Sequence, residues 1–181
     1  MAKIVSLKNK QTAEISLLSP KVTARQLMEF INKIIHERAF IVYRKKITLN
    51  AEKEWRLQKL KDQKTNQGFL LVVTVDGQIA GTSEARRDRT DSTMQNIGLG
   101  IAIAKKYRGI GLGEALLREN IAECRRFFSP KPKTIYLTVF KDNKVAQRLY
   151  RKIGFRKFAV FPNWVNHYGK FGDEIFMKLK K

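Results

Sequence analysis

The segment from residue 97 to residue 127 constrains the fold of this chain most. An apolar run over 97–104 predicts a strand, and an apolar stripe over 112–127 predicts a helix that follows almost directly. Between them lie glycines at the alternate positions Gly109, Gly111 and Gly113. Without Cβ atoms, successive backbone N–H groups can turn toward one phosphate at the positive end of the helix dipole. The segment therefore predicts a phosphate cradle, unless the glycines only make a tight turn.

The spacing of these glycines excludes two common nucleotide-binding loops. It is neither the Walker pattern Gly-x-x-x-x-Gly-Lys-Ser/Thr nor the dinucleotide pattern Gly-x-Gly-x-x-Gly. A phosphate bound here must belong to another class of ligand.

The rest of the chain predicts a mixture of helices and strands. Thr23 and Thr48 are suitable N-caps for two amphipathic helices that follow an opening strand, and Asp76-Gly77 predicts a hairpin turn. A helix over 143–153 should end at Gly154, and the stretch 169–174 is typical of a loop. The other expected strands are 69–75, 78–84, 134–140, 155–161 and 174–179. Because strands and helices do not alternate strictly, this order predicts an α+β fold.

Length and composition favour a single domain over residues 1–181. The chain has 181 residues, of which 43% are apolar, enough for one sizeable core and too many for a disordered chain. No stretch is apolar enough for a membrane span or a secretion signal, so we expect no membrane partner and a cytoplasmic location. A single cysteine makes an internal disulfide impossible. With only two histidines beside it, no metal site is expected.

The net charge indicates an anionic partner. Lys and Arg number 37 against 16 Asp and Glu, which gives a net charge of +21. The excess is spread over both halves of the chain, so it belongs to the folded body and not to a tail. Such a surface attracts RNA, DNA, a ribosome, an acidic protein or a polyphosphate cofactor through its summed field. Charge alone chooses none of them.

Two motifs resemble signatures of the GCN5-related N-acetyltransferase (GNAT) superfamily. Arg108, Gly111 and Gly113 match its acetyl-CoA motif, Arg/Gln-x-x-Gly-x-Gly/Ala. Residues 143–155 match every fixed position of its second motif, Asn-x-x-Ala-x-x-Leu-Tyr-x-x-x-Gly-Phe. The resemblance implies a mixed, mostly antiparallel central sheet, flanked by helices and splayed at the strand that binds the cofactor. It also implies an acetyl-CoA-dependent N-acetyltransferase.

The resemblance further implies which residues bind the cofactor. The backbone of Ile101, Ala102 and Ile103 would hold the pantetheine arm as if it were an added strand. Asn143, with Ala146 in the same motif, would bind the pantetheine or the acceptor, although Asn143 also suits a simple helix N-cap. The residues implied in binding the pyrophosphate are Arg108, Gly109, Ile110, Gly111, Leu112 and Gly113.

Tyr150 is the general acid that the resemblance implies. Attack of a neutral amine on a thioester expels a thiolate, and a phenol with a pKa of about 10 stays protonated at neutral pH and can donate to the sulfur. Its spacing from Ala146 and Ile153 is also that of an ordinary core residue of a helix.

The base that deprotonates the acceptor amine is less well defined. Many members of the superfamily carry a carboxylate on the cofactor strand, but residues 95–100 contain none. Glu84, near the end of the preceding strand, is the candidate, acting through water; the alternative is a salt-bridged strand residue beside Arg86 and Arg87. The two histidines are left unassigned. The side chains that we expect near the acceptor are Glu37, Glu84, Tyr168 and Asp173.

We therefore expect transfer of an acetyl group from acetyl-CoA to a primary amine by direct attack in a ternary complex. The amine can be a protein N-terminus, a lysine or a small amine. Cys124 lies in a predicted helix and is a poor acyl carrier, so no covalent acyl-enzyme is expected. The alternative is a basic nucleic-acid- or ribosome-binding module on an inactive scaffold of the superfamily. The oligomeric state stays open.

Overall fold

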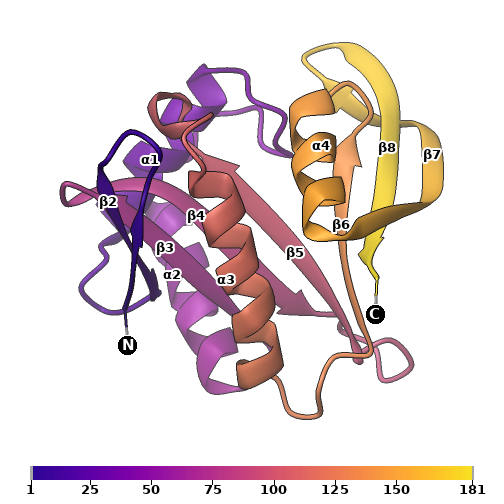
Figure 1. Ribbon diagram of the computed structural model, residues 1–181, viewed down its shortest axis with the longest axis horizontal. Helices are drawn as coiled ribbons and strands as arrows, with labels where there is room; N and C mark the ends of the chain where they lie inside the picture. Colours follow the sequence, from indigo (N-terminus) through magenta and orange to yellow (C-terminus); the bar gives the residue numbers. More distant parts are fainter. Residues whose placement is uncertain (1, 181) are drawn as a thin grey trace.

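The computed structural model describes residues 2–180 and contains an eight-stranded mixed sheet (Figure 1). The strands follow the order β1-β2-β3-β4-β5-β6-β8-β7, and every neighbouring pair is antiparallel except β5 and β6. The strands are β1 (Lys3–Ser6), β2 (Thr12–Leu17), β3 (Gly68–Val75), β4 (Gln78–Arg87), β5 (Asn96–Ile103), β6 (Thr134–Phe140), β7 (Phe155–His167) and β8 (Lys170–Leu179). The helices are α1 (Ala24–His36), α2 (Leu49–Lys64), α3 (Leu112–Phe127) and α4 (Lys144–Ile153), with a 3₁₀ turn, η1 (Lys105–Tyr107). This arrangement confirms the predicted α+β, mostly antiparallel fold.

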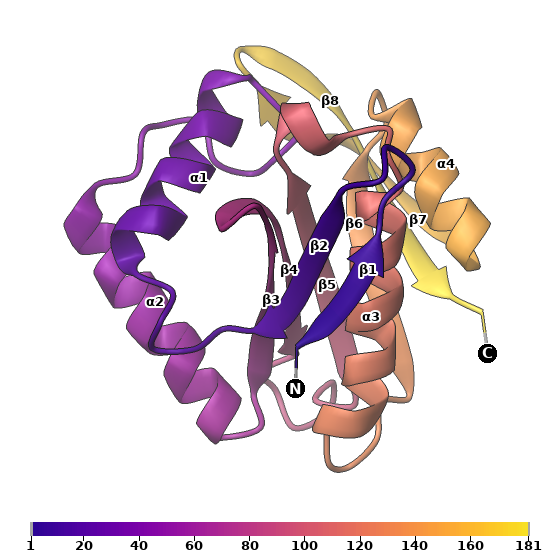
Figure 2. The same ribbon diagram turned by 60° about the vertical axis from the view of Figure 1, so that its left-hand side comes forward.

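Helices cover both faces of the sheet. Figure 2 shows α1 and α2 on one face and α3 and α4 on the other. α1 begins with a capping box, because the Thr23 side chain accepts from the Gln26 N–H and the Gln26 side chain accepts from the Thr23 N–H. Thr48 caps α2 by accepting from the Ala51 N–H. No helix within residues 2–180 has the length and hydropathy needed to cross a bilayer.

α2 departs in part from the amphipathic pattern that we expected. Trp55 and Leu60 pack against a small apolar cluster beneath the helix, but Leu57 is 62% exposed. The fully buried side chains of α2 are charged, namely Glu52 and Lys59. The inner face of α2 is therefore partly polar, and the hydrophobic pattern does not reveal it.

The structure corrects the expected single opening strand and the expected loop over 169–174. The chain opens with a hairpin of β1 and β2, whose turn contains neither glycine nor proline and places Lys10 in the left-handed region (φ 66°). β7 and β8 form another hairpin that turns at Tyr168 and Gly169 (φ 53° and 92°), so β8 begins at Lys170. Pro162 lies inside β7, which tolerates it because β7 is an edge strand with a register shift at this point.

The sheet opens between β5 and β6. These two strands pair only from Asn96 with Thr134 to Leu99 with Leu137. Beyond that point β5 continues to Ile103 beside β4 alone, and β6 continues beside β8 alone (Figure 1). Within the described residues, one edge of β5 over 100–103 therefore has no neighbouring strand. This confirms the predicted splay and opens the centre of the molecule.

Candidate active site

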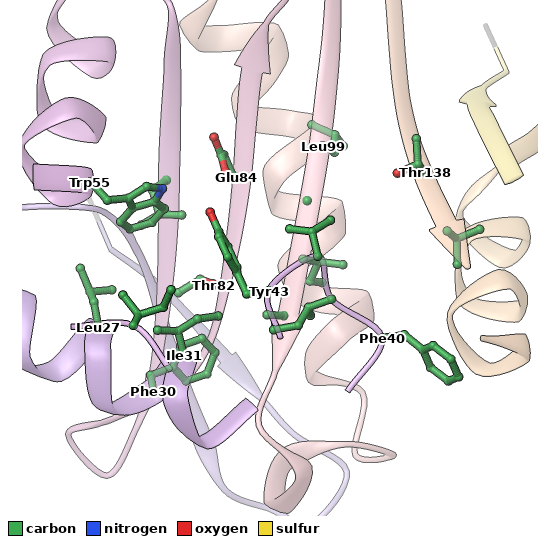
Figure 3. A pocket seen from close by; sticks show the side chains of 18 of the residues that line it. Leu27, Phe30, Ile31, Phe40, Tyr43, Trp55, Thr82, Glu84, Leu99 and Thr138 are labelled. Atoms are coloured by element: carbon green, nitrogen blue, oxygen red, sulfur yellow. The ribbon is translucent and has the colours of Figure 1, made fainter. Parts of the chain in front are cut away.

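A cavity of about 480 Å³ lies at the splay (Figure 3). Figure 3 shows Trp55 and side chains of α1 on one side of it, and Leu99 of β5 and Thr138 of β6 on the other. The loop after α1 closes part of it with Phe40 and Tyr43. Of the residues proposed from the sequence, the cavity is lined by Glu84, Ile101, Ala102, Asn143 and Tyr150. The fold thus brings the two halves of the chain together at one cavity.

Tyr150 reaches the cavity from α4. The helix ends at Gly154, whose φ of 114° favours glycine, and the Tyr150 ring packs near Phe155 with 6.1 Å between ring centroids. The residue is 7% exposed, and this burial raises the pKa of its phenol to about 12. Its hydroxyl forms no hydrogen bond within residues 2–180, although it lines the cavity. Tyr150 is therefore protonated at neutral pH, with its donor free for a ligand.

Asn143 combines the two roles that its sequence position suggested. Its side-chain oxygen accepts from the Ala146 N–H at 3.1 Å and caps α4. Its side chain also lines the cavity, so the NH₂ group is available there. Ala146 does not line the cavity and contributes through this backbone bond.

The glycine loop joins η1 to α3. Gly109 and Gly111 have φ values of 80° and 90°, which side chains with a Cβ atom rarely adopt, and Gly111 is the N-cap residue of α3. Gly113 lies against Leu149 of α4, where an added Cβ would come within 3.4 Å of that side chain. The backbone N–H groups of residues 109–113 donate to no acceptor within the described chain. Several unpaired donors therefore gather at the positive end of a helix.

The Arg108 side chain is engaged within the protein. Its guanidinium donates to Glu37 at 2.7 Å and to the Ile103 carbonyl at 2.8 Å. Glu37 also accepts from the Lys105 N–H and thus connects η1 to Arg108. It does not line the cavity. Ile103 likewise lies outside the cavity wall, unlike Ile101 and Ala102.

Glu84 forms an ion pair, but not with the neighbouring arginines. Its carboxylate accepts from the Lys59 ammonium of α2 at 2.5 Å, and that ammonium also lies 5.4 Å from the Trp55 ring centroid. Arg87 turns to the other side and donates to the Met94 carbonyl at 2.7 Å. Glu84 therefore lines the cavity as half of a partly buried ion pair.

The other residues that we considered lie elsewhere. The Tyr168 hydroxyl donates to the Ile35 carbonyl, and Asp173 pairs with Lys141. His167 stacks on Phe40 and contacts two backbone carbonyls. None of these side chains except Phe40 lines the cavity.

Sequence reasoning missed five polar residues of the cavity, namely Tyr43, Glu52, Thr82, Thr138 and Glu174. Glu52 is only 6% exposed, and burial raises the pKa of its carboxyl to about 7. Burial also raises the Tyr43 pKa, with added effects from the charges of Glu84 and Glu52. The available signal was spacing, because residues 52, 55 and 59 share one face of α2.

Known proteins have a similar fold and a partly similar sequence. The yncA protein of Salmonella typhimurium, solved with its cofactor acetyl-CoA, has a TM-score of 0.79 and 21% identity over 93% of each chain. An N-alpha-acetyltransferase of Sulfurisphaera tokodaii is 25% identical over 122 residues, 63% of this chain and 70% of that protein. The L-amino acid N-acetyltransferase AaaT of Escherichia coli is 27% identical over 111 residues, 61% of this chain and 67% of that protein.

The splayed sheet is the fold of the solved yncA protein. The model of the acetyltransferase (GNAT) family matches residues 32–155. The chain therefore belongs to the acetyltransferase (GNAT) family, and the family and enzyme class that we expected are confirmed.

Proposed function

We propose that the protein transfers the acetyl group of acetyl-CoA to a primary amine by direct attack, with both substrates bound at the splay. One observation carries the proposal: a single cavity is lined by residues 100–102 of β5, which have no strand on one side, and by Tyr150, whose hydroxyl has no partner within residues 2–180. The yncA protein, which has this fold, was solved with acetyl-CoA as its cofactor. That likeness supports the same cofactor here.

The residues along the splay fit acetyl-CoA. The unpaired N–H groups of residues 109–113 would hold the pyrophosphate, assisted by the dipole of α3. The open edge of β5 over 100–103 would hold the pantetheine arm through its remaining free backbone groups, because the Gly100 and Ile103 carbonyls already accept from Ser83 and Arg108. Arg108 would contribute to pyrophosphate binding through its main chain, and its ion pair with Glu37 would hold the loop in place. When bound, acetyl-CoA supplies the acetyl group as a thioester.

Tyr150 would donate its hydroxyl proton to the departing sulfur. Its burial keeps the proton in place at neutral pH, and no internal acceptor competes for it. Asn143 would use its free NH₂ group to orient the pantetheine or the acceptor.

Glu84 would help to remove the proton of the acceptor through water. An ammonium with a pKa of about 8 to 10 must lose a proton before it can attack. Glu84 stands directly opposite Gly100 on the cofactor strand, and Lys59 bonds to only one of its two carboxylate oxygens. The names of the relatives state different acceptors, an alpha-amino group in one and an L-amino acid in the other. They therefore support an amine acceptor without selecting one.

Acetyl-CoA binding and thiol release test the proposal. At about 100 times its Kd, acetyl-CoA should stabilise the protein by about 2.7 kcal/mol and raise its Tm by about 5 to 10 °C. Gly111→Trp should abolish both the shift and the thiol release. Gly169→Trp is the matched control, because Gly169 has a similar φ of 92° but lies in an open turn away from the cavity. No shift with acetyl-CoA, together with salt-sensitive RNA binding, would replace the proposal by the nucleic-acid- or ribosome-binding alternative.

A further inference from the structure

The wall of the cavity differs in charge from the rest of the molecule. Lys and Arg make up 37 of the 181 residues, yet in the described part of the chain no Lys, Arg or His lines the cavity. The charged residues that do line it are Glu52, Glu84 and Glu174. The cavity is thus a negative pocket within a strongly positive protein, and it is suited to a cation.

Glu52 lacks a cation of its own. Glu84 is held by Lys59, whereas no ion pair joins Glu52 to any residue between 2 and 180. A buried carboxylate without a partner is costly, and a cationic ligand would supply the missing charge. The pKa of about 7 reflects the same lack of a partner.

Glu52 shares the cavity wall with Glu84 and Tyr43. Burial raises the pKa of Tyr43 most, and the charges of Glu84 and Glu52 raise it further. Glu84 in turn stands opposite Gly100 of β5. Glu174 comes from β8, on the far side of the splay from α2, and does not share in this cluster.

Apart from Tyr43, Thr82 and Glu84, the wall on the side of α1 and α2 is largely apolar. Leu27, Phe30 and Ile31 of α1 lie with Trp55 of α2 on this side of the cavity (Figure 3), and Leu70 of β3 adds to them. A ligand whose ammonium meets Glu52 would place the rest of its body against hydrocarbon.

On the basis of the proposed function, we propose that the acceptor is a primary amine with an apolar body and no carboxylate, and that Glu52, in place of Glu84, binds its ammonium and accepts its proton. A free amino acid would bring a carboxylate into a pocket where Glu52 and Glu174 have no ion-pair partner among residues 2–180 and where no basic residue lines the wall. A polyamine would bring a second ammonium against the apolar wall. Both should be poor acceptors.

The protons balance as follows. Glu52 takes one proton from the ammonium, and the freed lone pair forms the C–N bond at the thioester carbonyl carbon. Tyr150 gives its hydroxyl proton to the sulfur as the C–S bond breaks, and it regains a proton from the new amide nitrogen. Glu52 then releases its proton to solvent. The sum is an amide, a thiol and one free proton from an ammonium and a thioester.

Matched acceptors test the chemical class. Thiol release at saturating acetyl-CoA would be measured with 2-phenylethylamine, L-phenylalanine, L-phenylalanine amide and spermidine. We expect kcat/KM for 2-phenylethylamine to exceed that for L-phenylalanine and for spermidine by at least about tenfold. L-Phenylalanine amide, which lacks the carboxylate, should have a kcat/KM closer to that of 2-phenylethylamine. Equal or faster turnover of L-phenylalanine or spermidine would overturn the acceptor class.

Two variants of α2 test the role of Glu52. Glu52→Gln should lower kcat/KM for 2-phenylethylamine by about 100-fold and remove its rise with pH near neutrality. Glu54→Gln makes the same change at an exposed position of the same helix and should stay within about twofold of wild type. The other titratable groups of this cavity wall are Tyr43, Glu84, Tyr150 and Glu174, with Lys59 beside Glu84.

The outcomes separate this inference from the proposed function. A Glu52→Gln enzyme with the kcat/KM and pH profile of Glu54→Gln would overturn the role of Glu52 while acetyl transfer stands. Acetyl-CoA affinity of Glu52→Gln, measured by calorimetry, should match wild type within about twofold, which distinguishes lost acceptor binding from lost folding. Should that variant not fold, Glu52→Asp is expected to retain a partial rate with a shifted pH profile, and an unchanged profile would count against Glu52. Failure to bind acetyl-CoA would overturn the proposed function and this inference together.

Discussion

Replacement of Glu52 by glutamine should change how the stability of the protein depends on pH. Burial raises the pKa of Glu52 from its ordinary value of 4.5 to about 7. The folded state therefore holds this proton more tightly than the unfolded chain does. The free energy of unfolding therefore decreases as pH rises from 4.5 to about 7, and the decrease is complete above about pH 7. A pKa change of this size corresponds to about 3 kcal/mol, and because water in the cavity screens the charge we expect a loss of about 1 to 3 kcal/mol.

Urea unfolding at about pH 5 and about pH 8.5 measures this loss. Relative to wild type, Glu52→Gln should gain about 1 to 3 kcal/mol of unfolding free energy between the lower and the higher pH. Glu54→Gln removes an exposed carboxylate from the same helix and should show no such gain. If the difference between wild type and Glu52→Gln were the same at both pH values, Glu52 would not be a desolvated carboxylate. The electrostatic description of the cavity would then be wrong.

Three further predictions concern other parts of the molecule. Tyr150→Phe should lower kcat by about 100-fold or more and leave the Kd for acetyl-CoA within about twofold, by steady-state kinetics and calorimetry; an unchanged kcat would remove Tyr150 from proton transfer. Gly111→Ala places a Cβ at φ 90° and should cost about 1 kcal/mol in thermal unfolding and weaken acetyl-CoA binding, whereas an unaltered Tm and Kd would show that the loop does not need glycine there. Cys124 is buried with its pKa raised to about 12, so iodoacetamide at about pH 8 should label it only after unfolding; rapid labelling of the native protein would contradict this environment.

The parts of the fold that could be predicted are those that short-range chemistry determines. The glycine loop before α3 and the stop of α4 at Gly154 need residues that tolerate positive φ, and the sequence shows glycine at these places. The β1–β2 turn and the first residue of the β7–β8 turn also need positive φ, but Lys10 and Tyr168 supply it there, whereas Gly169 supplies it at the next position. Such residues adopt this conformation because the paired strands impose it, and the local sequence carries no sign of that.

Part of the candidate site was predictable, from the second motif and from positions on the cofactor strand and its neighbour, as with Ile101, Ala102 and Glu84. Asn143 and Tyr150 belong to a motif, and both line the cavity as expected, although their roles stay predictions, as does that of Glu84. Glu52 stands in the first turn of α2, where acidic residues usually face solvent and favour the helix dipole. It faces inward because the cavity provides space for a polar group, and that space exists only once α1, α2 and the sheet have packed together.

The narrow contact between β5 and β6 also affects how the molecule deforms. Only the pairs from Asn96 with Thr134 to Leu99 with Leu137 join the first five strands to the last three. The ladders on either side of this contact are longer, so the β5–β6 contact is the shortest ladder across the centre of the sheet. A ligand bound in the opening would contact both the first five strands and the last three and would connect them. Rigidity of the whole sheet and occupancy of its centre are thus mechanically linked.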